Sequence, residues 1–188
     1  LYIGTFNSGI YKSTDWGANW VSINNGLGSS SAFRAIECKG NTLFAAGPIG
    51  TGVYRSSDFG ANWALLSGGL PPSSYRGFAS NTQLIVAGSF GRGVFYSANN
   101  GDSWTQINSG LTDTTIFDLE FNDNYLIAAT NTQGVFRFPL SALFNGTEQL
   151  DFSEPIVVYP NPTKNQLNFN LKTLQDAVRY VIYNYAGQ

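Results

Sequence analysis

The stretch Ser13–Trp20, with the sequence STDWGANW, returns as Ser56–Trp63 with the sequence SSDFGANW. A looser third copy, SANNGDSW, occupies Ser97–Trp104. The tryptophans that close the three copies are 43 and then 41 residues apart. Because the spacing is nearly fixed, the sequence predicts one structural unit that recurs with a period near 42 residues.

Each repeat contains four short apolar segments of strand length. The clearest of these aligns in all four units, as Leu1–Thr5, Leu43–Gly47, Leu84–Gly88 and Leu126–Thr130. A further strand opens each new unit, at Phe33–Cys38, Tyr75–Ser80 and Ile116–Phe121. Four strands per unit of about 42 residues are typical of propeller blades. We therefore predict an all-β chain that forms a partial β-propeller, with two whole blades and parts of two others.

Composition excludes several kinds of site. The net charge is −2, which does not favour nucleic-acid binding, and the chain has no histidine and a single cysteine. We expect no metal, no cofactor and no transmembrane segment. Cys38 is predicted to be buried by packing. Because the chain also lacks methionine, we expect it to be a fragment of a longer protein.

The repeated run S-x-D-x-G-x-x-W resembles the Asp box of sialidase-like propellers, and the resemblance covers about residues 1 to 140. Physical reasoning gives its residues a structural role. Asp or Asn accepts hydrogen bonds in a tight turn, Gly supplies its backbone conformation, and each Trp ring is expected to be buried between blades. The predicted structural residues are Ser13, Asp15, Gly17, Trp20, Ser56, Asp58, Gly60, Trp63, Ser97, Asn99, Gly101 and Trp104.

The order of the strands places the loops between the second and third strands, together with the loops between blades, on the side opposite the Asp-box motifs. There they surround the mouth of the channel. Exposed aromatics beside arginines there could stack on and hydrogen-bond a sugar. The resemblance implies an arginine cluster for a substrate carboxylate, an aspartate acid/base and a Tyr–Glu nucleophile pair. No catalytic residue is matched one by one to that pattern. The ligand-binding candidates are Arg34, Arg76, Arg92, Tyr75, Phe90, Phe6 and Asp118. The alternative is that Arg34 and Arg76 are solvated or pair with Glu37 or Glu120.

Composition changes after a polar connector at residues 141–154. From there, VVYPNPT at Val157–Thr163 and the later Gly187-Gln188 resemble the C-terminal sorting domain of type IX secretion. We predict domains at 1–140 and 155–188, the second being a truncated C-terminal sorting domain that forms the start of an Ig-like β-sandwich. Strands are expected at Ile156–Tyr159, Leu167–Leu171 and Val178–Tyr185. The resemblance implies type IX secretion machinery as a partner, and a secreted or outer-membrane surface location.

Three functions are compatible with these features. The leading hypothesis is a secreted or surface binding module for a glycan or protein ligand, because scaffold motifs are present without a complete catalytic set. The rival is a fragment of a propeller glycoside hydrolase, sialidase-like or xyloglucanase-like, whose catalytic acids lie in other blades. The third is an assembly or adhesion factor with the propeller as spacer. An isolated fragment is expected to be poorly soluble, since it would expose strand edges.

Overall fold

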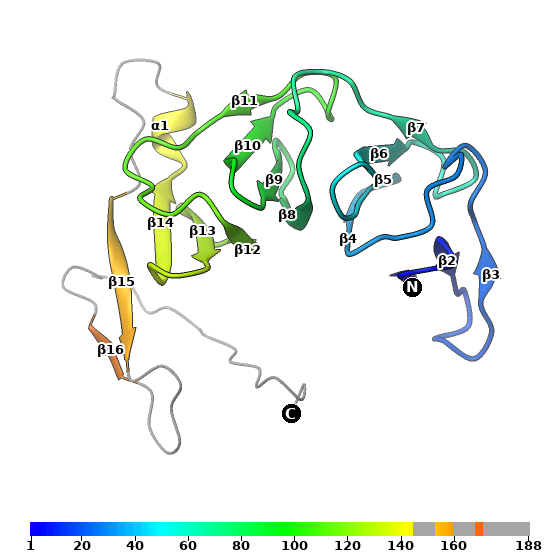
Figure 1. Ribbon diagram of the computed structural model, residues 1–188, viewed down its shortest axis with the longest axis horizontal. Coiled ribbons are helices and arrows are strands. Elements are labelled where there is room, and N and C mark those ends of the chain that lie inside the picture. The colour runs from blue at the N-terminus through cyan, green and yellow to red at the C-terminus, as the bar shows by residue number, and fades with distance from the viewer. Residues whose placement is uncertain (145–152, 160–167, 171–188) are drawn as a thin grey trace. The chain divides into compact units, whose positions relative to one another are not determined.

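The computed structural model describes residues 1–144, 153–159 and 168–170. The chain divides into two compact units, Leu1–Pro155 and Ile156–Gln188. Four antiparallel sheets follow one another along the first unit (Figure 1). We call these sheets blades 1 to 4.

Blade 1 contains three strands and blades 2 and 3 contain four each. The three strands of blade 1 correspond to the second, third and fourth strands of blades 2 and 3, and we number its strands by that correspondence. The strands of blades 1 and 2 are β1 (Tyr2–Gly4), β2 (Ile10–Lys12), β3 (Val21–Ser22), β4 (Ala35–Lys39), β5 (Thr42–Ala46), β6 (Val53–Ser56) and β7 (Ala64–Leu65). Those of blades 3 and 4 are β8 (Tyr75–Ser80), β9 (Ile85–Ser89), β10 (Gly93–Ser97), β11 (Thr105–Gln106), β12 (Ile116–Phe121), β13 (Tyr125–Thr130) and β14 (Val135–Pro139). Each strand pairs with the next along the chain within its blade, so the predicted partial β-propeller is confirmed.

The three repeated motifs form tight turns between the third and fourth strands of blades 1 to 3, and we call them box turns. In the first, the Ser13 hydroxyl donates to Asp15 Oδ1 at 2.8 Å and accepts from the Gly17 N–H at 2.8 Å. Residues 16 and 17 both have positive φ, 59° and 92°, as a type I′ hairpin turn requires. The other two box turns repeat these bonds from Ser56 and Ser97.

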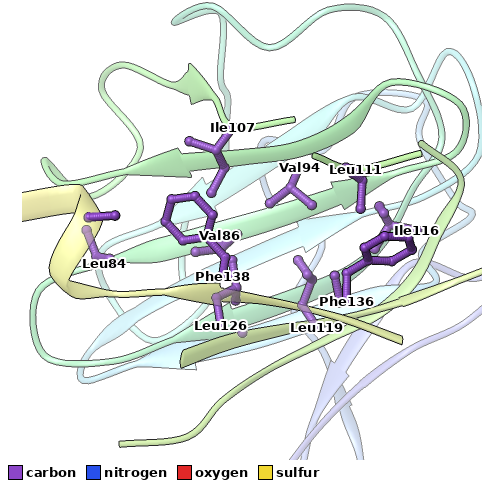
Figure 2. Packing of buried hydrophobic residues seen from close by; sticks show 13 residues of the cluster. Leu84, Val86, Val94, Ile107, Leu111, Ile116, Leu119, Leu126, Phe136 and Phe138 are labelled. Carbon is purple, nitrogen blue, oxygen red and sulfur yellow. The ribbon is translucent and has the colours of Figure 1, made fainter. Parts of the chain in front are cut away.

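The hydrophobic core is divided into three clusters, one between each pair of neighbouring blades. Ile10 and Trp63 belong to the cluster between blades 1 and 2, and Phe44 and Trp104 to that between blades 2 and 3. Figure 2 shows the third cluster, in which Val86 and Val94 of blade 3 face Leu126, Phe136 and Phe138 of blade 4. Each blade is therefore stabilised by its neighbours rather than by a core of its own.

Trp20 departs from the expected burial of the box tryptophans. Its exposed fraction is 40%, against 5% for Trp63 and 8% for Trp104. Trp63 donates its ring N–H to the Ile23 carbonyl of blade 1, and Trp104 packs edge-on against Phe44 of blade 2. Each of these rings is covered by the preceding blade, and no described residue plays that part for Trp20.

Cys38 is exposed, which corrects the prediction that it is buried. It lies near the end of β4, which is an edge strand of its sheet, and it pairs with Leu43 next to the turn at Gly40. An edge strand has a neighbour on one side only, so its side chains are covered less completely than those of β5, all of whose residues are buried.

Beyond blade 4 the structure describes three short elements. Helix α1 (Ser141–Phe144) begins the predicted connector, and its Ala142 packs into the cluster between blades 3 and 4. Strands β15 (Ser153–Tyr159) and β16 (Asn168–Asn170) pair antiparallel, through Val157 with Asn170 and Tyr159 with Asn168. These two strands fall on two of the predicted segments. The third, Val178–Tyr185, and the sandwich it would complete lie outside the described residues.

Candidate functional site

The candidate site lies on the edge of the blades opposite the box turns, which we call the rim. Two kinds of loop meet there, the loops between the second and third strands of a blade and the loops between blades. The Phe90 backbone forms a bridge with Thr115 of the next loop, and the Gly91 N–H donates to the Thr114 carbonyl at 3.1 Å. Neighbouring blades are thus joined by backbone hydrogen bonds at the rim.

Two β-bulges turn side chains out of the first strands of blades 3 and 4. The register of β8 against β9 shifts between Tyr75 and Gly77, and that of β12 against β13 shifts between Ile116 and Asp118. The extra residues are Arg76 and Phe117. Bulges re-aim a side chain and are common beside functional sites. Here they bring an arginine and a phenyl ring from neighbouring blades together.

Arg76 lies between two phenyl rings, an arrangement that we call the rim clamp. Its guanidinium carbon is 4.4 Å from the centre of the Phe90 ring and 5.0 Å from that of Phe117. Both rings are partly exposed, at 47% and 41%. The buried Arg76 Nε and the buried Ser74 hydroxyl have no hydrogen-bond partner among the described residues. The clamp therefore holds a charged group whose Nε donor is not used by the described part of the chain.

The backbone of Phe90 is fixed from both sides. Its N–H donates to the Ser74 carbonyl at 2.8 Å, and its carbonyl accepts from the Ser73 hydroxyl at 3.1 Å. Together with the bridge to Thr115, these bonds anchor one wall of the clamp to two blades. The ring is preorganised, so a ligand that contacts it has little ordering of the protein to overcome.

A smaller version of the clamp lies two blades earlier. The guanidinium carbon of Arg34 is 5.6 Å from the centre of the Phe6 ring, which is 61% exposed. Phe6 and Phe90 occupy the same place in their blades, and so do Arg34 and Phe117. The sequence candidates Phe6, Arg34, Arg76 and Phe90 are thus brought together in two groups.

Tyr75 and Arg92 take different roles. Tyr75 is buried, and its hydroxyl donates to the Pro71 carbonyl at 2.7 Å, so the ring supports the loop instead of facing the rim. Burial raises the pKa of Tyr75 far above its usual range, and the nearby Arg92 charge opposes this only in part. Arg92 is exposed beside it, with no hydrogen bond from its guanidinium to any described residue.

Asp118 and Asp113 differ in how firmly they are held. Asp118 is exposed, and its carboxylate accepts the N–H of Leu119 at 3.0 Å. Asp113, which the sequence did not single out, accepts from the Thr115 N–H and from both the N–H and the hydroxyl of Thr132. Burial acts to raise the pKa of Asp113, but these hydrogen bonds outweigh it and the pKa is lowered. The signal available in the sequence was the position of Asp113 within the threonine-rich loop Thr112–Thr115.

A row of polar residues runs along the first strands of blades 2 to 4. Glu37 pairs with Phe44 and Glu120 with the equivalent Ile127, whereas Ser80 pairs with Ile85, one register position further along its strand. The Ser80 hydroxyl donates to Glu37 at 2.6 Å. Burial raises the pKa of Glu37, the bond from Ser80 opposes this, and the Glu120 charge raises it further. Neither Glu37 nor Glu120 forms an ion pair with Arg34 or Arg76, because Arg55–Asp102 is the one ion pair found among the described residues.

No group of three or more His, Cys, Asp or Glu side chains among the described residues could hold a metal ion. No helix there is both long and apolar enough to cross a membrane.

Comparison with solved structures bears on the architecture. The extracellular domain of a putative one-component system from B. thetaiotaomicron matches 82% of this chain and 21% of its own, with a TM-score of 0.63 and 16% identity. The fold is that of a β-propeller. An ancestral GH74 enzyme matches 72% of this chain and 20% of its own, with a TM-score of 0.59 and 22% identity.

A GH74 enzyme of Niastella koreensis gives a similar result, with 24% identity over 73% of this chain and 26% of its own, and a TM-score of 0.55. This chain therefore spans between a fifth and about a quarter of the length of these three proteins. No protein-family model and no curated protein sequence matches it. At these identities the likeness is one of fold, so function must be argued from the residues of the site.

Proposed function

We propose that this chain belongs to a secreted or cell-surface propeller that binds a glycan or protein ligand at the rim. The observation that carries the proposal is the rim clamp, where Arg76 lies between the exposed rings of Phe90 and Phe117 with buried polar atoms unpaired. Aromatic faces beside a few convergent polar groups are typical of ligand sites. That the B. thetaiotaomicron protein with this fold is an extracellular domain supports the location.

Binding to an array of oligosaccharides and extracellular proteins tests this proposal. The full-length protein should retain at least one class of ligand, and Arg76→Gln should weaken that binding while the melting temperature stays within a few degrees. Lys39→Gln serves as the control, because it removes a positive charge on the side of the box turns. Binding that survives Arg76→Gln and Phe117→Ala unchanged would place the ligand elsewhere and refute the proposal.

We further propose that residues 155–188 direct export through type IX secretion. The support is the resemblance of Val157–Thr163 and of the closing Gly187-Gln188 to the sorting domain. In a bacterium that carries this secretion system, deletion of residues 155–188 should move the protein from the cell surface or medium to the periplasm. Export that continues unchanged after the deletion would refute this part of the proposal.

The second candidate is a glycoside hydrolase of which this chain is a part. It is favoured by the GH74 enzymes among the proteins of this fold. Asp118 is the exposed acid of the rim that would be tested first. Hydrolysis of xyloglucan or of a fluorogenic sialoside by the full-length protein, abolished by Asp118→Asn, would establish this candidate. Absence of hydrolysis by a protein that binds the same sugar would favour the binding module.

A further inference from the structure

The first wall of the rim clamp is attached to the loop at residues 112–115, which leads from blade 3 into blade 4. The Phe90 backbone forms a bridge with Thr115, the last residue of this loop. One residue earlier, the Thr114 carbonyl accepts the N–H of Gly93 at 2.8 Å. The chain on both sides of Phe90 and the loop are therefore held together by backbone contacts.

The second wall is joined to the same loop along the chain. Phe117 follows Thr115 by two residues, and the register shift between Ile116 and Asp118 turns it out of the strand. Ile116 itself is buried in the cluster between blades 3 and 4. A displacement of Thr115 would therefore disturb both Phe117 and Phe90.

The carboxylate of Asp113 holds this loop in place. Its Oδ1 accepts the Thr115 N–H at 2.9 Å, and its Oδ2 accepts both the N–H of Thr132 at 2.6 Å and the hydroxyl of Thr132 at 2.8 Å. Thr132 lies in the loop between β13 and β14 of blade 4, where the Asn131 N–H also donates to the Thr115 carbonyl at 3.0 Å. The carboxylate thus joins the loop between the blades to a loop of blade 4.

An ionised side chain suits this position. A carboxylate only accepts hydrogen bonds and has room for several donors, and bonds to a charged acceptor are stronger than those between neutral groups. The two other connections between blades in this part of the chain, residues 23–34 and 66–74, contain no acidic residue. The Asp113 contact therefore belongs to the loop of the rim clamp and is not a feature of the repeat.

We infer that Asp113 is a positioning residue of the rim clamp, because its carboxylate fixes the loop on which the Phe90 and Phe117 rings depend. The inference rests on the proposed function, since it names a further residue of the same site. The hydrogen bonds of Asp113 go to Thr115 and Thr132, so it acts through the loop and not on a ligand. Without it, a ligand would have to order the two rings on binding, which costs affinity.

An NMR signal of Arg76 tests the inference without any ligand. Its guanidinium carbon lies 4.4 and 5.0 Å from the centres of the two rings, so their ring currents displace the signal of the buried Nε–H. In full-length protein with isotope-labelled arginine, this signal is the one that Arg76→Lys removes. Asp113→Ala should move it towards the position of an exposed arginine. Asp113→Asn should retain part of the displacement, because its amide oxygen still accepts hydrogen bonds.

Binding to the array of oligosaccharides and extracellular proteins gives the second measurement. For every component of the array whose binding requires Arg76, Asp113→Ala should weaken binding by about tenfold, since it removes hydrogen bonds to a charged group. Asp113→Asn should weaken it less.

Two further variants complete the design. Asp123→Ala is the control, because Asp123 is an exposed aspartate in the turn between β12 and β13, at the end of β12 away from the clamp. It should leave the Arg76 signal and the binding unchanged. Thr132→Val removes one of the bonds to Asp113 and should move the signal in the same direction by a smaller amount. It keeps the inference testable if Asp113→Ala does not fold.

The outcomes separate the inference from the proposed function. An Arg76 signal that stays in place in Asp113→Ala would overturn the inference, even if the melting temperature falls. A signal that moves while Arg76-dependent binding is unchanged would also overturn it, because the clamp would then not need its loop. If the signal moves and no component of the array depends on Arg76, the positioning of the clamp by Asp113 stands and the proposed function fails.

Discussion

Arg55 of blade 2 contacts the box turn of blade 3, with its Nη1 2.6 Å from Asp102 Oδ1 and 2.6 Å from the Asn100 carbonyl oxygen. Lys12 has the same place in blade 1, and its ammonium group lies 3.5 Å from the Phe59 carbonyl of the box turn of blade 2. We call this contact a latch. It joins the third strand of one blade to the box turn of the next, outside the hydrophobic clusters.

Removal of the Arg55 latch should lower the stability of the first unit modestly. Both side chains of the ion pair are partly exposed, so water screens the pair, and we expect Arg55→Ala to cost about 1 kcal/mol in the free energy of unfolding. Urea denaturation measures the change. Arg92→Ala is the matched control and should stay within about 0.5 kcal/mol, because its guanidinium donates no hydrogen bond to any described residue. Equal losses in both variants would show that the latch contributes nothing.

Two of the three box turns should make stability depend on acid. The pKa of Asp15 is lowered from 3.8 to about 2, mainly by the Asn19 backbone, and that of Asp58 likewise, mainly by the Asn62 side chain. Because the unfolded chain binds protons more readily than these folded carboxylates, their contribution is full above about pH 4 and is lost as the pH falls towards about 2. Carboxyl carbon NMR titration gives both pKa values directly.

The third box turn supplies the control for this prediction. Asn99 takes the place of the aspartate and accepts the same bonds, from the Ser97 hydroxyl at 2.8 Å and the Ser103 N–H at 3.0 Å. Asp58→Asn copies that chemistry, so this variant should fold and lose part of its stability change between pH 4 and pH 2. An acid transition identical to that of the unmodified protein would contradict the assignment.

The box tryptophans should differ in their contribution to stability. Trp63 is 5% exposed and donates its ring N–H to Ile23 of the preceding blade at 2.8 Å, whereas Trp20 is 40% exposed. Trp63→Ala should cost about 3–5 kcal/mol, and Trp20→Ala clearly less. Denaturation curves followed by circular dichroism test this. Acrylamide should quench the fluorescence of a Trp63→Phe variant more efficiently than that of a Trp20→Phe variant. The reverse order would show that Trp20 is covered.

Gly60 should tolerate a side chain less well than Gly50. Its φ is +89°, and a Cβ there would collide with the end of the Ile23 side chain of blade 1, which would have to move. Gly50 has nearly the same φ, +91°, with open space around it. Gly50→Ala should therefore cost only the backbone strain of about 1–2 kcal/mol, and Gly60→Ala more than that. Thermal denaturation of the two variants separates the collision from the strain, and equal losses would argue against a tight contact between blades.

The strands could be predicted because the chain repeats them. A segment such as Leu84–Gly88 is ambiguous alone, but it aligns with three others, and the four short apolar segments of each repeat favour strands over helices. The box turns were equally accessible, since the bonds made by Ser13 and Asp15 are local in sequence. Both kinds of element depend on neighbours within one repeat.

Contacts between blades could not be predicted in this way. The exposure of Trp20 depends on what covers it and not on its own motif. Tyr75 and Arg76 are adjacent in sequence, yet one is buried and the other joins the rim clamp because a bulge lies between them. A shift of one residue in register reverses which side chains face outwards, and no spacing in the sequence marks this bulge. The order of the strands places Arg76 and Phe90 on the same side of the blades, and the structure adds that the guanidinium stacks on the ring.

The latches also set limits on how such a chain can be rearranged in evolution. Lys12 and Arg55 both precede a blade with a box turn, whereas blade 3 carries Tyr96 at that place and precedes blade 4, which has none. A recombination event that swapped blades 1 and 2 would still leave the second and third box turns with a cationic partner. Copying blade 3 to an earlier position would leave the next box turn without one. Duplication of whole repeats is thus tolerated in some orders and penalised in others.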